Sequence, residues 1–85
     1  MPEISRFFGI RIRMYHDDHR PPHFHAVYGD DSVAVEIGSG VVHGRFPPRA
    51  LRLVIEWYHL HRQELLVDWH LVTTGNLPEP IDPLK

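Results

Sequence analysis

Several histidines are close together in the sequence near residue 20, at a spacing that would suit acid-base catalysis. Residues 17–25 hold two consecutive prolines, followed by His23, Phe24 and His25. Proline fixes its own φ and biases the preceding residue toward extended conformations, so we expect the chain to enter His23 as a strand. Residues two apart in a strand share a face, which predicts that the two imidazoles project together. Such a pair can act as general base and general acid.

Two arginines and a glutamate are predicted to lie on the same face. Residues 4–15 alternate apolar and polar after Gly9, and Glu36 faces outward in a later strand. If neighbouring strands are antiparallel, the shared face contains Arg11, Arg13, His23, His25 and Glu36. Guanidinium groups stabilise negative charge that builds on phosphorus, so this face predicts metal-free RNA cleavage. The alternative is an ordinary polar solvent face of an open sheet, without chemistry.

The same stretch offers possible metal ligands. They are His16, His19, His23 and His25, with the neighbouring Asp17 and Asp18. Imidazole and carboxylate groups bind zinc, nickel or iron. The spacing matches no established zinc finger or helix-borne zinc motif, so we expect no native metal and no cofactor. The four histidines remain the candidate ligands if a metal is bound.

Short alternating segments predict an antiparallel sheet. The expected strands cover residues 4–15, 23–28, 33–37 and 41–45, separated by polar or glycine-containing turns. Short successive connections imply a meander. The predicted inward side chains are Ile10, Ile12, Met14, Phe24, Ala26, Tyr28, Val33, Val35 and Ile37. The fold class is therefore α+β, with three to four strands packed on a helix.

A helical periodicity begins at Pro48 and predicts one long helix over residues 48–74. Gly75 and the prolines after it end this helix and leave an extended tail over 76–85. Arg62 lies within the apolar stripe of the helix. Either its side chain snorkels or the helix is kinked near residues 59–63.

The predicted helix carries a second apolar stripe, which includes Leu53, Trp57 and Leu60. One small sheet covers only one face of a helix, so these side chains are predicted to contact a partner. The partner would be a second copy of the chain, giving a homodimer, or a small cognate protein. The alternative is that the kink turns the second half of the helix and brings both stripes into one core.

Composition restricts the remaining possibilities. The chain has 85 residues, which fits a single domain over 1–85, and its formal net charge is −2 with neutral histidines. Its eight histidines can raise this charge to as much as +6 (−2 + 8) in acid. Without a cysteine, disulfides and thiolate metal sites are excluded. No apolar run suits a signal peptide or a membrane span, so we expect a cytoplasmic location and no membrane partner.

Several motifs resemble one bacterial family. They are Ile4-Ser5-Arg6-Phe7-Phe8-Gly9-Ile10, Met14-Tyr15, Asp18-His19, Pro21-Pro22-His23-Phe24-His25, Arg49-Ala50-Leu51-Arg52-Leu53-Val54, Glu56-Trp57 and residues 59–65. Together, from Ile4 to about Trp69, they are similar to the family catalogued as domain of unknown function 4160. Its members are often encoded beside another small protein, in what look like toxin-antitoxin pairs. The resemblance implies a component of such a module, without a mechanism.

Three functional hypotheses follow. The first is a toxin-antitoxin-like component that acts on RNA, with His23, His25, Arg11 and Arg13 as candidate catalytic residues and Glu36 beside them. The second is a protein-binding module without catalysis. The third is a histidine-rich metal-binding domain.

Overall fold

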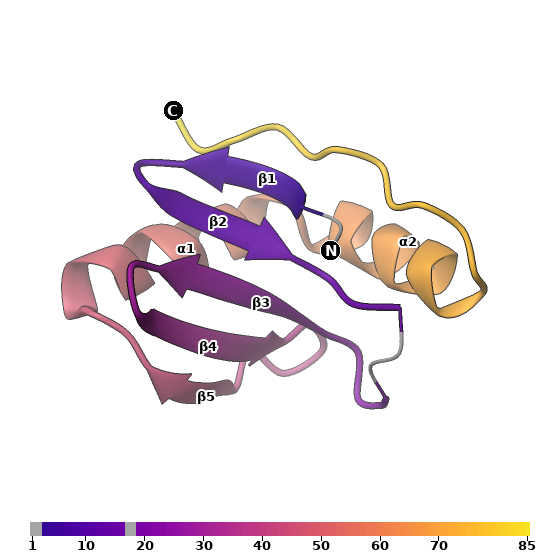
Figure 1. Ribbon diagram of the computed structural model, residues 1–85, viewed down its shortest axis with the longest axis horizontal. Coiled ribbons are helices and arrows are strands. Elements are labelled where there is room, and N and C mark those ends of the chain that lie inside the picture. The colour runs from indigo at the N-terminus through magenta and orange to yellow at the C-terminus, as the bar shows by residue number, and fades with distance from the viewer. Residues whose placement is uncertain (1–2, 17–18) are drawn as a thin grey trace.

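The structure, a computed structural model, describes residues 3–16 and 19–85, and within these it contains five strands and two helices. They are β1 (Glu3–Phe7), β2 (Ile10–Arg13), β3 (His23–Tyr28), β4 (Asp31–Glu36), β5 (Val42–Arg45), α1 (Pro48–Leu60) and α2 (Arg62–Thr73). The strands form one antiparallel sheet in the order β1-β2-β3-β4-β5. Both helices lie against one face of this sheet (Figure 1). The α+β class and the meander are therefore confirmed.

The single strand expected over residues 4–15 is wrong, because the chain reverses at Phe8 and Gly9. These residues have φ angles of 49° and 79°, and they connect β1 to β2 as a two-residue hairpin turn. Glycine adopts positive φ at little cost, whereas phenylalanine rarely does. Of the two turn residues, only Gly9 is of a type that indicates a turn. The sheet therefore has one strand more than expected.

The register of the sheet places the predicted apolar side chains toward the helices. Ile12 pairs with Ala26, and Phe24 pairs with Val35, so their side chains meet in one layer. Every predicted inward residue is buried except Tyr28, which is 41% exposed at the end of β3. The alternation of apolar and polar residues thus identified the core face of each strand, and it failed only at Tyr28, where β3 ends.

The expected long helix is two helices, broken at His61 within the 59–63 stretch. His61 has φ −125° and ψ 24°, which is not helical, and α2 begins at the next residue. The Arg62 guanidinium donates a hydrogen bond to the Gly38 carbonyl oxygen at 3.1 Å and lies 5.6 Å from the centre of the Tyr58 ring. The break thus moves Arg62 out of the apolar stripe and toward the turn before β5.

Residues 76–85 form a tail without helix or strand that runs back beside β1 (Figure 1, yellow). The Ile81 amide donates to the Ile4 carbonyl oxygen at 2.7 Å, and the Trp57 indole N–H donates to the Asp82 carbonyl oxygen at 2.8 Å. Ile81 and Leu84 are buried in the core. The tail therefore covers the β1 edge and one side of α1.

This cover overturns the expectation that Trp57 is available to a partner. Trp57 is 0% exposed, and its ring lies 5.5 Å from that of Phe7 and 5.7 Å from that of Phe24. Leu53 is half-buried, and only Leu60, at 65%, is well exposed. The sheet alone could not cover the second stripe, but the sheet and the tail together cover its central residue.

The tail is also held by Asp68 of α2, which makes stability depend on pH. Burial raises the pKa of Asp68 above its usual value, although its Oδ1 accepts the Glu79 amide at 2.8 Å. A raised pKa means that this residue contributes stability fully below the ordinary aspartate pKa of about 3.9, and that this contribution is lost as pH rises through the folded-state value.

We expect Asp68→Asn to remove this loss, since an asparagine Oδ1 still accepts the Glu79 amide while the buried charge is gone. Urea unfolding of both proteins across pH 3–8 checks the prediction. The stability of the wild type relative to the variant should fall as pH rises. A difference that stays constant with pH contradicts it.

Candidate functional site

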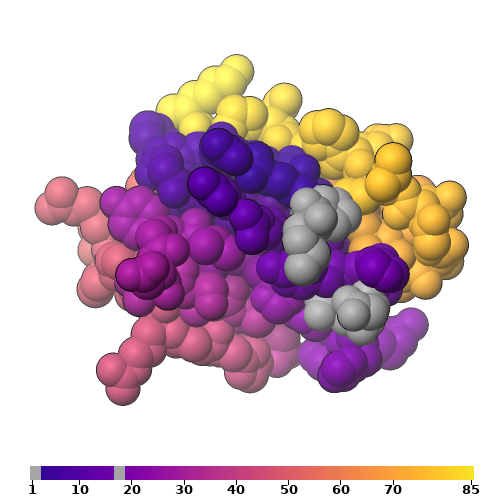
Figure 2. Space-filling model, in the orientation of Figure 1, coloured from indigo at the N-terminus to yellow at the C-terminus, as the bar shows by residue number. Residues whose placement is uncertain are grey.

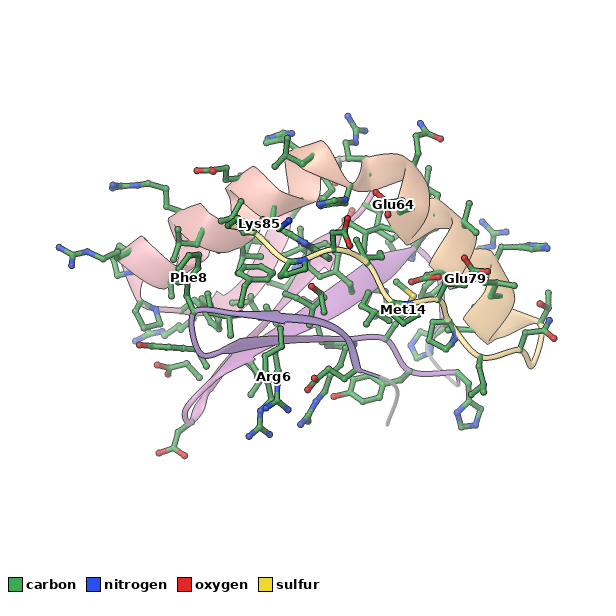
Figure 3. The ribbon with its side chains drawn as sticks, turned by 90° about the horizontal axis from the view of Figure 1, so that it is seen from above. Arg6, Phe8, Met14, Glu64, Glu79 and Lys85 are labelled. Carbon is green, nitrogen blue, oxygen red and sulfur yellow. The ribbon has the colours of Figure 1, made fainter. Side chains whose placement is uncertain are left out.

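The outer face of the sheet, turned away from the helices, carries two rows of polar side chains. One row runs across four strands through Arg13, His25, Ala34 and His43, and the next runs through Arg11, Val27, Ser32 and Arg45. His23 pairs with Glu36 at the end of β3. The five residues predicted to share a face therefore do so. Figure 3 shows the same direction for Arg6 of β1, which projects away from the helices.

Two imidazoles lie together on this face, at the end of β3 that is near α2. The rings of His23 and His25 are 5.0 Å apart in an edge-on arrangement. Tyr15 lies against His25 at 4.6 Å, and Trp69 of α2 lies against His23 at 5.3 Å. Each imidazole therefore packs against an aromatic ring as well as against the other imidazole.

A short hydrogen bond fixes which nitrogen of His23 is basic. Its Nδ1 lies 2.7 Å from the carbonyl oxygen of Pro21. A carbonyl oxygen only accepts, so Nδ1 carries the hydrogen and donates it. In the neutral ring Nε2 is then the basic nitrogen. The proline pair thus delivers His23 into its strand and also orients its ring.

His43 is a further member of the face that the sequence analysis did not single out. Its Nε2 lies 2.7 Å from Oε2 of Glu36, while Ser39 donates a hydrogen bond to the other oxygen of that carboxylate at 3.0 Å. The hydrogen bonds from His43 and Ser39 lower the pKa of Glu36. Glu36 therefore stays ionised and positions His43. The alternation of the expected strand over 41–45 was the available signal for His43.

A hollow of about 180 Å³ opens beside His23. It is lined by His19, Arg20, Pro21, His23, Ala34, Glu36 and His43. Ala34 stands in the row between His25 and His43, and its methyl group leaves the space that a larger side chain would fill. The lining offers imidazole and guanidinium donors around a small floor, which suits a phosphate or a flat polar ring.

Basic groups outnumber acidic groups among the described residues on this face. The basic ones are Arg6, Arg11, Arg13, His23, His25, His43 and Arg45; the acidic ones are Glu3 and Glu36. Glu3 is paired with Arg6 at 2.9 Å, and Glu36 with His43. Both carboxylates are thus engaged by neighbours within the face. Figure 2 views the molecule from this side, where the strand side chains form one continuous surface.

The expected metal ligands do not converge within the described residues. Among residues 3–16 and 19–85, no three histidine, aspartate or glutamate side chains are placed to hold one metal ion. His16 and His19 are both exposed. Asp17 and Asp18, the carboxylates considered with them, lie outside the described residues.

Residues 9–70 match the model of the family described as domain of unknown function (DUF4160), and the chain belongs to this family. The matched region contains the imidazole pair, both arginines of β2 and the two helices up to His70. No curated protein and no solved structure matches the sequence. In the part of the chain that the structure describes, neither helix is long and apolar enough to span a bilayer.

Proposed function

We propose that this protein acts on RNA through the outer face of its sheet, as one component of a toxin-antitoxin-like pair. The observation that carries the proposal is the row in which Arg13 stands directly beside His25, next to His23 at 5.0 Å between ring centres. A guanidinium and two imidazoles within one small area match what a phosphodiester needs: charge neutralisation and proton transfer. The proposal that the protein is one component of such a pair rests on the family resemblance alone.

The proposed reaction needs no metal. The Nε2 of His23 takes the proton from a ribose 2′-hydroxyl, whose oxygen attacks the adjacent phosphorus. His25, in its protonated form, gives a proton to the departing 5′-oxygen, and the Arg13 guanidinium stabilises the charge on the phosphoryl oxygens. The P–O5′ bond breaks as the 2′-O–P bond forms. The products are a 2′,3′-cyclic phosphate and a 5′-hydroxyl.

Binding of the RNA would combine two features of the same face. Arg11 and Arg45 lie at two positions of the second row and can contact backbone phosphates. The hollow floored by Ala34 accepts a neighbouring base or phosphate. Single-stranded RNA fits such a surface better than a duplex, because its bases are free to turn toward protein side chains.

Cleavage of RNA in the presence of a chelator tests the proposal, with two matched variants. Ala34→Leu fills the hollow while keeping every imidazole of the face, and Ser32→Leu adds a leucine side chain to the neighbouring row of the same strand. We expect the wild type to yield cyclic-phosphate ends. Ala34→Leu should weaken RNA binding at least about 10-fold, as loss of one or two charge-assisted contacts would. Ser32→Leu should change it far less.

Two results would contradict the proposal. One is the absence of both binding and cleavage by the wild type. The other is an equal effect of the two leucine variants, which would show that the hollow is not used. If the wild type binds RNA but does not cleave it, the proposed RNA-binding surface stands and the proposed cleavage reaction is wrong.

A second candidate is a protein-binding module that self-associates. Phe8 is 60% exposed, and it borders a hollow of about 130 Å³ lined also by Leu53 of the predicted partner surface. Exposed aromatic side chains beside an apolar hollow are typical of interfaces. If two chains pair here, light scattering should give twice the monomer mass for the wild type and the monomer mass for Phe8→Ser. A monomeric wild type at high micromolar concentration would exclude the homodimer.

A further inference from the structure

A third hollow, of about 190 Å³, lies between α2 and the tail. It is lined by Glu64, Val67, Asp68, Glu79, Pro80 and Ile81. Figure 3 shows Glu64 on α2 and Glu79 on the tail that passes it. The RNA proposal uses none of these residues. Three of the six lining side chains are carboxylates, and the other three are apolar.

The Asp68 carboxylate is buried without complete hydrogen bonding. Asp68 is 1% exposed, and while its Oδ1 accepts the Glu79 amide at 2.8 Å, its Oδ2 has no hydrogen-bond partner among the described residues. An unsatisfied buried carboxylate oxygen is costly, and structures usually supply a donor for it. Burial raises the pKa of this group, and the Glu79 and Glu64 carboxylates add to the effect. A positively charged donor in the hollow would therefore stabilise the ionised form of Asp68.

The lining also indicates which kind of cation would fit. Within the described residues no group of three acidic or imidazole side chains is arranged to hold a metal ion, so a coordinated metal does not fit the geometry. Val67, Pro80 and Ile81 instead form an apolar wall beside the carboxylates. Long basic side chains lay their methylene stems on such walls and present their charge to a carboxylate.

We infer that this hollow binds an arginine side chain of a partner protein. The guanidinium would donate to Asp68 and Glu79, and its stem would lie on Val67 and Ile81. Arginine is favoured over lysine because its planar fork pairs with two carboxylate oxygens at once. Glu64 contributes less, since His61 already lies 2.6 Å from its Oε1. The inference is independent of the RNA proposal.

Titration with small probes, followed by backbone amide NMR shifts, tests the inference. The probes are N-acetyl-arginine amide, N-acetyl-lysine amide and N-acetyl-citrulline amide, the last being a neutral analogue of arginine with nearly the same shape. We expect saturable shifts at Val67, Asp68 and Glu79 with the arginine probe. The lysine probe should bind more weakly, and the citrulline probe should give no saturable change.

Two variants of the full chain complete the test. Asp68→Asn keeps the acceptor for the Glu79 amide but removes the charge, and it should weaken the arginine probe at least about 10-fold. Glu56→Gln, an exposed position on α1, removes one charge elsewhere and should leave binding unchanged. Ile4 and Ile81 amide shifts report whether the tail stays in place.

The inference is overturned if the citrulline probe binds as well as the arginine probe, if no shift saturates, or if Asp68→Asn binds like the wild type with its tail in place. Equal binding of the lysine probe overturns the assignment to arginine. RNA cleavage should be the same in Asp68→Asn and wild type, so failure here and failure of the RNA proposal are separable.

Discussion

Trp57→Ala should remove a large part of the free energy of unfolding of the chain. The substitution removes a fully buried indole that contacts the rings of Phe7 and Phe24, and it removes the hydrogen bond to the Asp82 carbonyl oxygen. Truncation of a buried tryptophan costs about 3–5 kcal/mol. A small domain has only about 5–15 kcal/mol of stability in total, so one substitution takes a large part of it. Urea unfolding followed by circular dichroism measures the loss.

Two control variants separate the causes. Trp57→Phe keeps an aromatic ring in the core but removes the N–H donor, and should cost about 1–2 kcal/mol. Leu60→Ala, three residues further along α1 and 65% exposed, should change stability by less than about 0.5 kcal/mol. If Trp57→Ala were as stable as Leu60→Ala, the burial of Trp57 by the tail would be wrong.

RNA cleavage should fall about 100-fold or more in His23→Ala and in His25→Ala. General acid and general base groups each contribute about 10²–10⁴-fold, and the proposed reaction needs both. His23 and His25 are both half-buried on the outer face, so neither substitution removes a core side chain. Initial rates on a short single-stranded RNA in chelator, with folding checked by circular dichroism, give the comparison.

The double variant adds a second criterion. If the two imidazoles act in one reaction, the loss in the double variant should be far smaller than the product of the two single losses. His59→Ala, an exposed histidine on α1, is the matched control and should keep wild-type activity. Equal cleavage by all these proteins would assign the activity to a contaminating nuclease.

The outer face could be predicted because it depends only on alternation. Strand side chains repeat every two residues, so Arg11 and Arg13 share a face whatever the neighbouring strands do, and so do His23 and His25. The remaining step was the pairing of Arg13 with His25, which follows from short connections between antiparallel strands. The hollow over Ala34 depends on the size of side chains from three segments, and local patterns carry no such information.

The burial of the tail was harder to predict for a related reason, whereas the break at His61 confirms the kink that Arg62 suggested near residues 59–63. Ile81 and Leu84 lie in a proline-rich segment without periodicity, so no pattern indicates that they are buried. The two apolar stripes expected over residues 48–74 assumed one continuous helix, and the non-helical backbone at His61 changes the direction of the residues after it. Phe8 misled the strand count because its side chain is a strand former in a turn conformation.

The tail has a consequence for how the molecule forms during synthesis. The strands and α1 leave the ribosome before residues 81–84, yet the Ile4 carbonyl and the Trp57 indole take their partners from that later segment. Until it emerges, the nascent chain exposes an unpaired strand edge next to an uncovered aromatic ring, a combination that attracts chaperones and other chains. We therefore expect chains truncated before residue 81 to accumulate in the insoluble fraction. The docking of residues 81–84 thus completes the β1 edge and the cover of Trp57.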